Sequence, residues 1–140
     1  MNYGKQVLAV LLFMVPLVAS AQLGSSNGVQ AQVPFQFMVG DKVVPAGECI
    51  VQEATMAAET IMVRSKYAKV SLFTAAAPIE AVQEGTGSAL VFHKYGDRYF
   101  LSQVRVEGSH TIYQLPESKA EAELRGQNVP ATEETVPSSL

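Results

Sequence analysis

The sequence has a single cysteine and little charge: 16% of its residues are charged, with 10 Lys+Arg against 13 Asp+Glu. One cysteine excludes a disulfide framework within the chain and a cysteine-rich zinc site. The two signs are nearly balanced, so nothing marks the chain as a nucleic-acid-binding protein, which would show a clustered basic face, and we expect no nucleic-acid partner. With 140 residues, the chain allows one domain, with or without a tail, and not two domains of ordinary size.

Ligands for a metal ion are also scarce. The sequence has 2 histidines, His93 and His110, and neither stands at a spacing that is typical of metal ligands. A metal site would need both, together with a carboxylate such as Glu107 or Asp97. We therefore expect no metal and no cofactor.

Sequence motifs of known catalytic sites are missing as well. A serine hydrolase would have to pair Ser102 or Ser109 with His93 or His110, but the chain has no G-x-S-x-G elbow to expose a serine. The segment 85–87, Gly-Thr-Gly, lacks the rest of a phosphate-binding fingerprint and a βαβ setting. The sequence therefore favours a protein without enzymatic activity and predicts no catalytic residues.

The N-terminus has the pattern of a secretory signal peptide. Lys5 is followed by the uncharged apolar run Val7–Val18 and by the small residues at 19–21, Ala-Ser-Ala. The run is shorter than the roughly 20 residues that a membrane-spanning helix needs. We expect residues 1–21 to be removed before Gln22, which leaves an exported protein of the periplasm or the extracellular space without a membrane span. An uncleaved N-terminal anchor is the alternative.

The rest of the chain predicts short strands. Residues 22–32 are polar, with glycine and serine, and are expected to be a flexible leader; residues 33–125 form the domain. Alternation of apolar and polar residues predicts strands, with Pro34 at a strand start and an interruption at 75–78. The predicted strands are 33–39, 42–44, 48–52, 60–64, 66–74, the two arms of a hairpin in 89–106, and 111–115.

The hairpin within 89–106 is the clearest of these. Gly96-Asp97 suits a two-residue turn, which places Tyr95 opposite Arg98, His93 opposite Phe100 and Phe92 opposite Leu101. The polar residues near the tip form a candidate binding surface, on which tyrosines contact a ligand and cations bind an anionic group. A solvated hairpin end is the alternative. The residues of this surface are His93, Lys94, Tyr95, Asp97, Arg98 and Tyr99.

A short helix follows the strands. Ser118 and Glu121 form an S-x-x-E capping box, Ala120 and Leu124 share one helical face, and Gly126 stands where a helix ends. Such a short helix must dock on the sheet to persist. Residues 126–140 lack periodicity and are expected to be a disordered tail. The fold class is therefore all-β, an antiparallel sandwich or small barrel of about seven short strands with one C-terminal helix.

Three segments resemble an uncharacterised family of small exported β-rich bacterial proteins, found particularly in acidobacteria. They are the run 90–103 (LVFHKYGDRYFLSQ), the pair 33–37 (VPFQF) and 44–48 (VPAGE), and the run 115–124 (LPESKAEAEL). The resemblance implies the same boundaries for the domain and supplies no catalytic residues. Similar proteins often have an aromatic residue where this chain has Cys49, which suggests a core position.

Cys49 has two possible states. It shares a strand face with Val51, where a free cysteine behaves as a small buried hydrophobe, but in an exported protein it could instead form an intermolecular disulfide. We favour the buried thiol.

These observations predict an exported, non-enzymatic β-domain with a binding or structural role in the cell envelope. A small β-barrel that carries an apolar ligand is the first alternative, and an enzyme of unrecognised type is the second. The expected partner is an envelope protein or a small apolar ligand.

Overall fold

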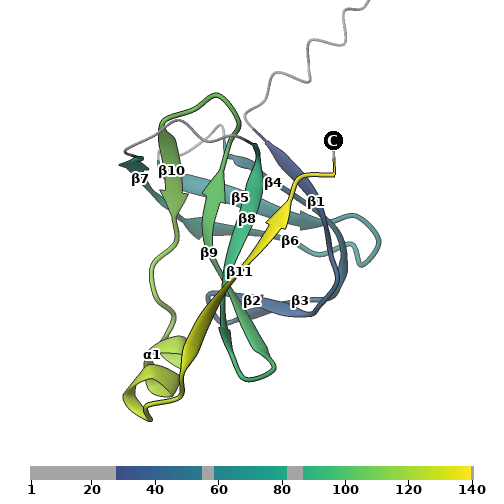
Figure 1. Cartoon of the computed structure of the whole chain (residues 1–140). Coiled ribbons are helices and arrows are strands. Elements are labelled where there is room, and N and C mark those ends of the chain that lie inside the picture. Colours follow the sequence, from purple (N-terminus) through teal and green to yellow (C-terminus); the bar gives the residue numbers. More distant parts are fainter. Residues whose placement is uncertain (1–27, 55–58, 82–86, 140) are drawn as a thin grey trace, which may run out of the picture.

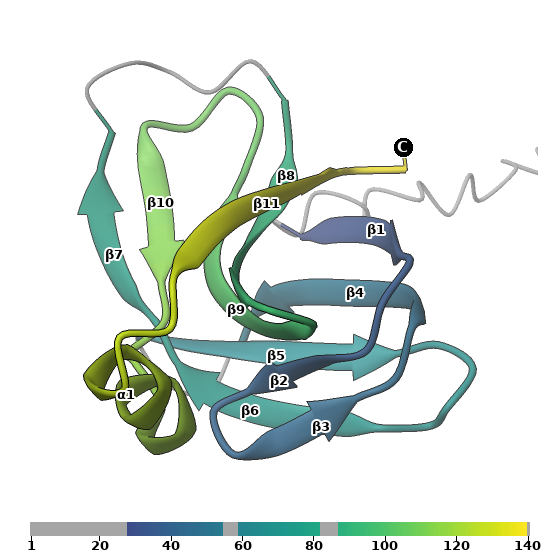
Figure 2. The same ribbon diagram turned by 60° about the horizontal axis from the view of Figure 1, so that its bottom comes forward.

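The computed structural model describes residues 28–54, 59–81 and 87–139. These residues form two sheets that face each other, with one short helix, and the pairing is antiparallel except for one parallel bridge between β2 (Phe37–Val39) and β9 (Arg98–Arg105). The strands of one sheet cross those of the other steeply (Figures 1 and 2). The all-β sandwich is therefore confirmed, although the described residues contain more strands than predicted. The elements are β1 (Val29–Val33), β2 (Phe37–Val39), β3 (Lys42–Val44), β4 (Gly47–Glu53), β5 (Thr60–Ser65), β6 (Ser71–Ala75), β7 (Ala77–Glu80), β8 (Ala89–Tyr95), β9 (Arg98–Arg105), β10 (Thr111–Gln114), α1 (Lys119–Gly126) and β11 (Ala131–Pro137).

The first sheet begins inside the segment predicted to be a flexible leader. Its strands lie in the order β1-β4-β5-β6, and β1 pairs with β4 from Val29 to Val33. Val29, Ala31 and Val33 are buried in the core, so the prediction of a leader at 22–32 is wrong for residues 29–32. The period-2 alternation that makes this strand extends back past the proline, into a stretch whose overall composition is polar. The predicted signal peptide, residues 1–21, lies outside the described residues.

Pro34 divides the segment 33–39, which the alternation of apolar and polar residues predicts as a single strand. β1 ends at Val33 and β2 begins at Phe37, because Pro34 has no N–H to donate to a ladder. The break lets the chain leave the first sheet: β2 pairs with β3 across a turn at Gly40 (φ 61°) and touches β9 of the second sheet at Met38.

The chain passes from the first sheet to the second again between β6 and β7. β6 begins only at Ser71 because Lys66–Val70 forms the turn after β5, with Lys69 at a φ of 54°. The predicted interruption at 75–78 is narrower than expected, since β7 starts at Ala77, just after the buried Ala76. β7 is an edge strand of the second sheet, which is where Pro78 is tolerated.

The second sheet has the order β11-β8-β9-β10-β7 and is built on the predicted hairpin. Tyr95 pairs with Arg98, His93 with Phe100 and Phe92 with Leu101, so the predicted register is confirmed. Gly96 has a φ of 65°, and Asp97 is not among the described non-glycine residues with a positive φ. A positive φ at the first turn position alone is typical of a type II′ turn.

The helix starts as the capping box predicted. The Ser118 hydroxyl accepts a hydrogen bond from the Glu121 amide at 3.1 Å, which satisfies one of the free N–H groups of the first turn. Its end differs from the prediction, because Gly126 is still helical and Asn128 adopts the left-handed conformation (φ 59°). The amides of Asn128 and Val129 bond to the carbonyls of Arg125 and Leu124, which is the pattern of a Schellman cap.

The prediction of a disordered tail at residues 126–140 is wrong, because the last strand, β11, lies within this segment. β11 pairs with β8 along its whole length, from Ala131 opposite Tyr95 to Pro137 opposite Ala89. Only Val136 of this strand is buried, because β11 lies at the sheet edge with its other side chains toward solvent. A strand with a single buried side chain lacks the apolar alternation by which strands are recognised in a sequence.

Side chains of both sheets fill the space between them. The amide of Ser139 bonds to the carbonyl of Gln30 at 2.8 Å, which ties the end of β11 to β1. Among the fully buried side chains, the largest are Phe37, Phe92, Phe100, Ile61 and Leu90.

Candidate functional site

The residues predicted at the tip of the β8–β9 hairpin divide between its two faces. Side chains alternate along a strand, and the register groups His93 and Tyr95 with Phe100 on the face toward α1. Lys94 and Tyr99, which are opposite each other, occupy the other face. The predicted surface is therefore two sites, a polar network under the helix and a groove at the tip.

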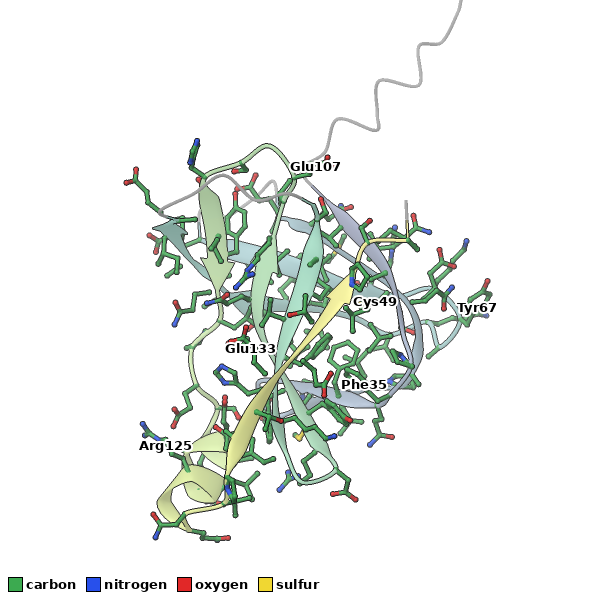
Figure 3. The ribbon with its side chains drawn as sticks, viewed as in Figure 1. Phe35, Cys49, Tyr67, Glu107, Arg125 and Glu133 are labelled. Atoms are coloured by element: carbon green, nitrogen blue, oxygen red, sulfur yellow. The ribbon has the colours of Figure 1, made fainter. Side chains whose placement is uncertain are left out.

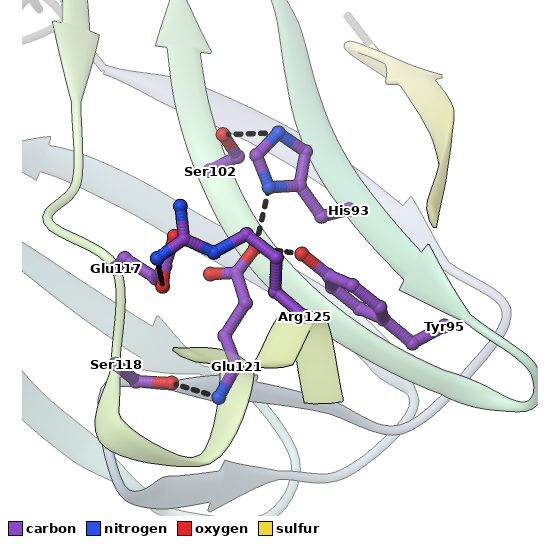
Figure 4. A network of polar contacts seen from close by, with 7 residues as sticks. All are labelled: His93, Tyr95, Ser102, Glu117, Ser118, Glu121 and Arg125. Carbon is purple, nitrogen blue, oxygen red and sulfur yellow. Dashed lines mark hydrogen bonds and ion pairs between the residues drawn. The ribbon is translucent and has the colours of Figure 1, made fainter. Parts of the chain in front are cut away.

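Glu121 is the centre of the polar network (Figure 4). Its Oε1 lies 2.5 Å from His93 Nδ1 and accepts a hydrogen bond from the Tyr95 hydroxyl at 3.0 Å. On the other side of the ring, His93 Nε2 lies 3.1 Å from the Ser102 Oγ. Because a carboxylate only accepts, we assign a proton to Nδ1, which makes Nε2 the acceptor for the Ser102 hydroxyl.

Ser102 lies at a β-bulge, on the same face of the hairpin as His93. Val91 is opposite Gln103 and Phe92 is opposite Leu101, so Ser102 has no opposite residue on β8. A bulge leaves the extra residue unpaired in the ladder, and the Ser102 carbonyl instead accepts from the Leu115 amide at 2.9 Å. The sequence analysis considered Ser102 with His93 only as a pair required by a hydrolase, and nothing in the pattern predicted the bulge.

The capping box places Glu121 on the sheet side of the helix. In a capping box the carboxylate can reach back to the first turn, but here it extends to His93 and Tyr95 and is buried. Arg125 pairs instead with Glu117 at 3.0 Å on the exposed side of the helix. The sequence analysis missed Glu121 as a site residue, although the expectation that the helix docks on the sheet is consistent with this contact.

Tyr95 remains a neutral donor in this network. Burial, and next the hydrogen bond to Glu121, raise the pKa of Tyr95 to about 12. The phenol therefore keeps its proton at all physiological pH values and holds the Glu121 carboxylate in place.

A surface groove of about 400 Å³ lies at the hairpin tip, between that tip and the β2–β3 hairpin. The Phe35 ring (Figure 3) stacks on Tyr99 with centroids 3.7 Å apart and planes inclined by 11°. Three residues of the predicted binding surface reach this groove, and the sequence analysis missed the others. Its lining comprises Phe35, Gln36, Phe37, Met38, Val43, Asp97, Arg98 and Tyr99.

The cations of the predicted surface lie against aromatic rings. Lys94 Nζ is 5.5 Å from the centroid of Tyr99, and the Arg98 guanidinium is 5.4 Å from that of Phe100. These distances are typical of cation–π contacts. Arg98 also lies 3.6 Å from the Met38 sulfur and is exposed, so its charge can still meet an anion in the groove.

Within 28–54, 59–81 and 87–139, no group of three or more His, Cys, Asp or Glu residues could hold a metal ion. In the same part of the chain, no helix is long and apolar enough to span a membrane.

Cys49 (Figure 3) is buried on β4, as the sequence favoured. Burial raises the pKa of its thiol from 9.0 to about 12, so the nucleophilic thiolate is scarce at neutral pH. We expect a thiol reagent such as iodoacetamide to label Cys49 only after denaturation, as measured by intact mass. Rapid labelling of the native protein would contradict the buried assignment.

Comparisons with protein-family models, curated proteins and solved structures gave no match to this chain.

Proposed function

We propose that this protein is an exported binding domain whose ligand lies in the groove at the hairpin tip. The observation that carries the proposal is the meeting of Asp97, Arg98 and Tyr99 with Phe35 and Met38 around one groove. Polar residues at an ordinary solvated turn need not border a groove lined in part by aromatic and aliphatic side chains. Export is supported by the charged, apolar and small-residue pattern of residues 1–21.

The lining defines the class of ligand. Phe35 and Tyr99 present stacked aromatic surface, and Val43 is an exposed apolar side chain of the β2–β3 hairpin. Polar groups beside apolar surface orient a ligand in its site, and the guanidinium of Arg98 suits a carboxylate or sulfonate. The ligand we propose has a planar apolar part and one anionic group, as a free small molecule or as part of an envelope partner.

The carrier alternative requires an apolar cavity inside the sandwich. Phe37 and Phe92 occupy the core between the two sheets, and the groove at the tip is open to solvent. The geometry therefore favours binding at the surface.

Binding can be tested with anilinonaphthalene sulfonate, a dye that has a planar apolar part and one anionic group. We expect saturable fluorescence enhancement with the native protein, and NMR shifts at Phe35 and Tyr99. Arg98→Gln should weaken binding by about tenfold, because a hydrogen bond to a charged group is lost.

The matched control is Arg64→Gln, which removes another exposed arginine, from β5. It should leave the dissociation constant unchanged. An equal loss of affinity in both variants, or NMR shifts that avoid Phe35 and Tyr99, would refute the groove as the ligand site.

A further inference from the structure

We infer that Ser102 is an activated nucleophile, with His93 as its general base and Glu121 as the positioning residue, and that it accepts acyl groups from small activated esters. This activity goes beyond ligand binding in the groove and belongs to the polar network under α1. The observation behind it is the continuous chain of contacts Ser102–His93–Glu121 (Figure 4).

The geometry matches what a serine nucleophile requires. The Ser102 Oγ is 3.1 Å from His93 Nε2, which is within the reach of a base that takes the hydroxyl proton. The Glu121 carboxylate, 2.5 Å from Nδ1, fixes the tautomer in which Nε2 is free to accept. It also stabilises the imidazolium that forms, as the acidic member of a Ser–His–acid triad does.

The acid is itself held in place. The Ser118 cap stabilises the first turn of its helix, and Tyr95 donates a second hydrogen bond to the same carboxylate oxygen. A network whose members are all paired is rigid, so the imidazole has little freedom to turn away from Ser102.

Access to the pair is open on the histidine side. The side chain of His93 is 40% exposed, whereas Ser102 as a residue is 8% exposed. A substrate must therefore approach along the edge of the imidazole ring and be small. This burial is why we assign small esters and not polymeric substrates.

Ester cleavage at Ser102 proceeds through an acyl-serine intermediate. The Ser102 Oγ attacks the ester carbonyl carbon while Nε2 takes the hydroxyl proton. The C–O bond to the leaving group breaks, and the alcohol departs with the proton from Nε2. Water then attacks the acyl-Ser102 ester with Nε2 as base, which releases the carboxylic acid and restores the Ser102 hydroxyl.

The test uses diisopropyl fluorophosphate, in which the serine oxygen replaces fluoride on phosphorus. We expect one adduct on the native protein, located at Ser102 by peptide mass spectrometry, and none in Ser102→Ala. His93→Gln should slow labelling by about 10²-fold or more, because the general base is lost. Glu121→Gln should slow the labelling of the protein that remains folded, as judged by circular dichroism.

The chain offers a matched control in a second serine–histidine pair, Ser109 and His110, which are adjacent in the sequence. Ser109→Ala and His110→Gln should label at the native rate. Hydrolysis of p-nitrophenyl acetate should follow the same order across these variants. An unlabelled native protein, an adduct at another residue, or a native labelling rate in His93→Gln would each overturn the inference and leave the network as a helix anchor.

Discussion

Deletion of residues 131–140 should cost the domain on the order of 5 kcal/mol of stability, since it removes a complete ladder of backbone hydrogen bonds. β11 pairs with β8 at every position from Ala131 to Pro137, and β8 carries Leu90, Val91 and Phe92 of the core. The loss is comparable to the whole stability of many domains. Urea unfolding followed by circular dichroism measures it, and the exposed edge of β8 should also cause aggregation.

The control is a shorter deletion, of residues 138–140. It removes the bonds from Ser138 and Ser139 to Gln30 but leaves the ladder intact, so it should cost much less. If both deletions had the same small effect, β11 would not be part of the folded core.

Phe92→Ala should destabilise the protein by about 3–5 kcal/mol, because it leaves a cavity where a large side chain was packed. Phe92 is 0% exposed. Its ring lies 5.0 Å, centroid to centroid, from those of Phe35 and Phe37. The free energy of unfolding from urea titration measures the effect.

The same substitution at Phe73 is the matched control. Phe73 is 66% exposed, and a surface substitution of this kind should change stability by no more than about 0.5 kcal/mol. Equal costs at the two positions would mean that the β8–β9 hairpin does not pack as described.

Local chemistry was enough to predict the hairpin. The Gly96-Asp97 turn and the flanking apolar residues determine which residues pair, because a register slip of one residue would turn the apolar side chains to solvent. The strands at both ends of the described chain were harder to predict. β1 was obscured by the polar segment before it, and β11 has one buried side chain, so its place depends on pairing with a distant strand.

The candidate sites likewise have a part that local sequence predicts and a part that depends on tertiary contacts. Period-2 alternation already separates His93 and Tyr95 from Lys94 and Tyr99, so the sequence alone predicts which residues lie on each face of the hairpin. Glu121 reaches His93 only because the helix folds back onto the sheet, 28 residues along the chain. Contacts of this kind depend on tertiary packing and have no local pattern.

The bond between Ser139 and Gln30 brings the first and last described strands of the domain close together. The order of strands in the two sheets, and not the residue at which the domain starts, defines the fold. A short linker could therefore join Ser139 to Val29 while new termini open at the Glu107–Gly108 turn, and both sheets would be preserved in such a circular permutant. Fusion partners attached before Val29 or after Ser139 would leave the domain at the same point, which suits its use as a side-by-side tether for two proteins.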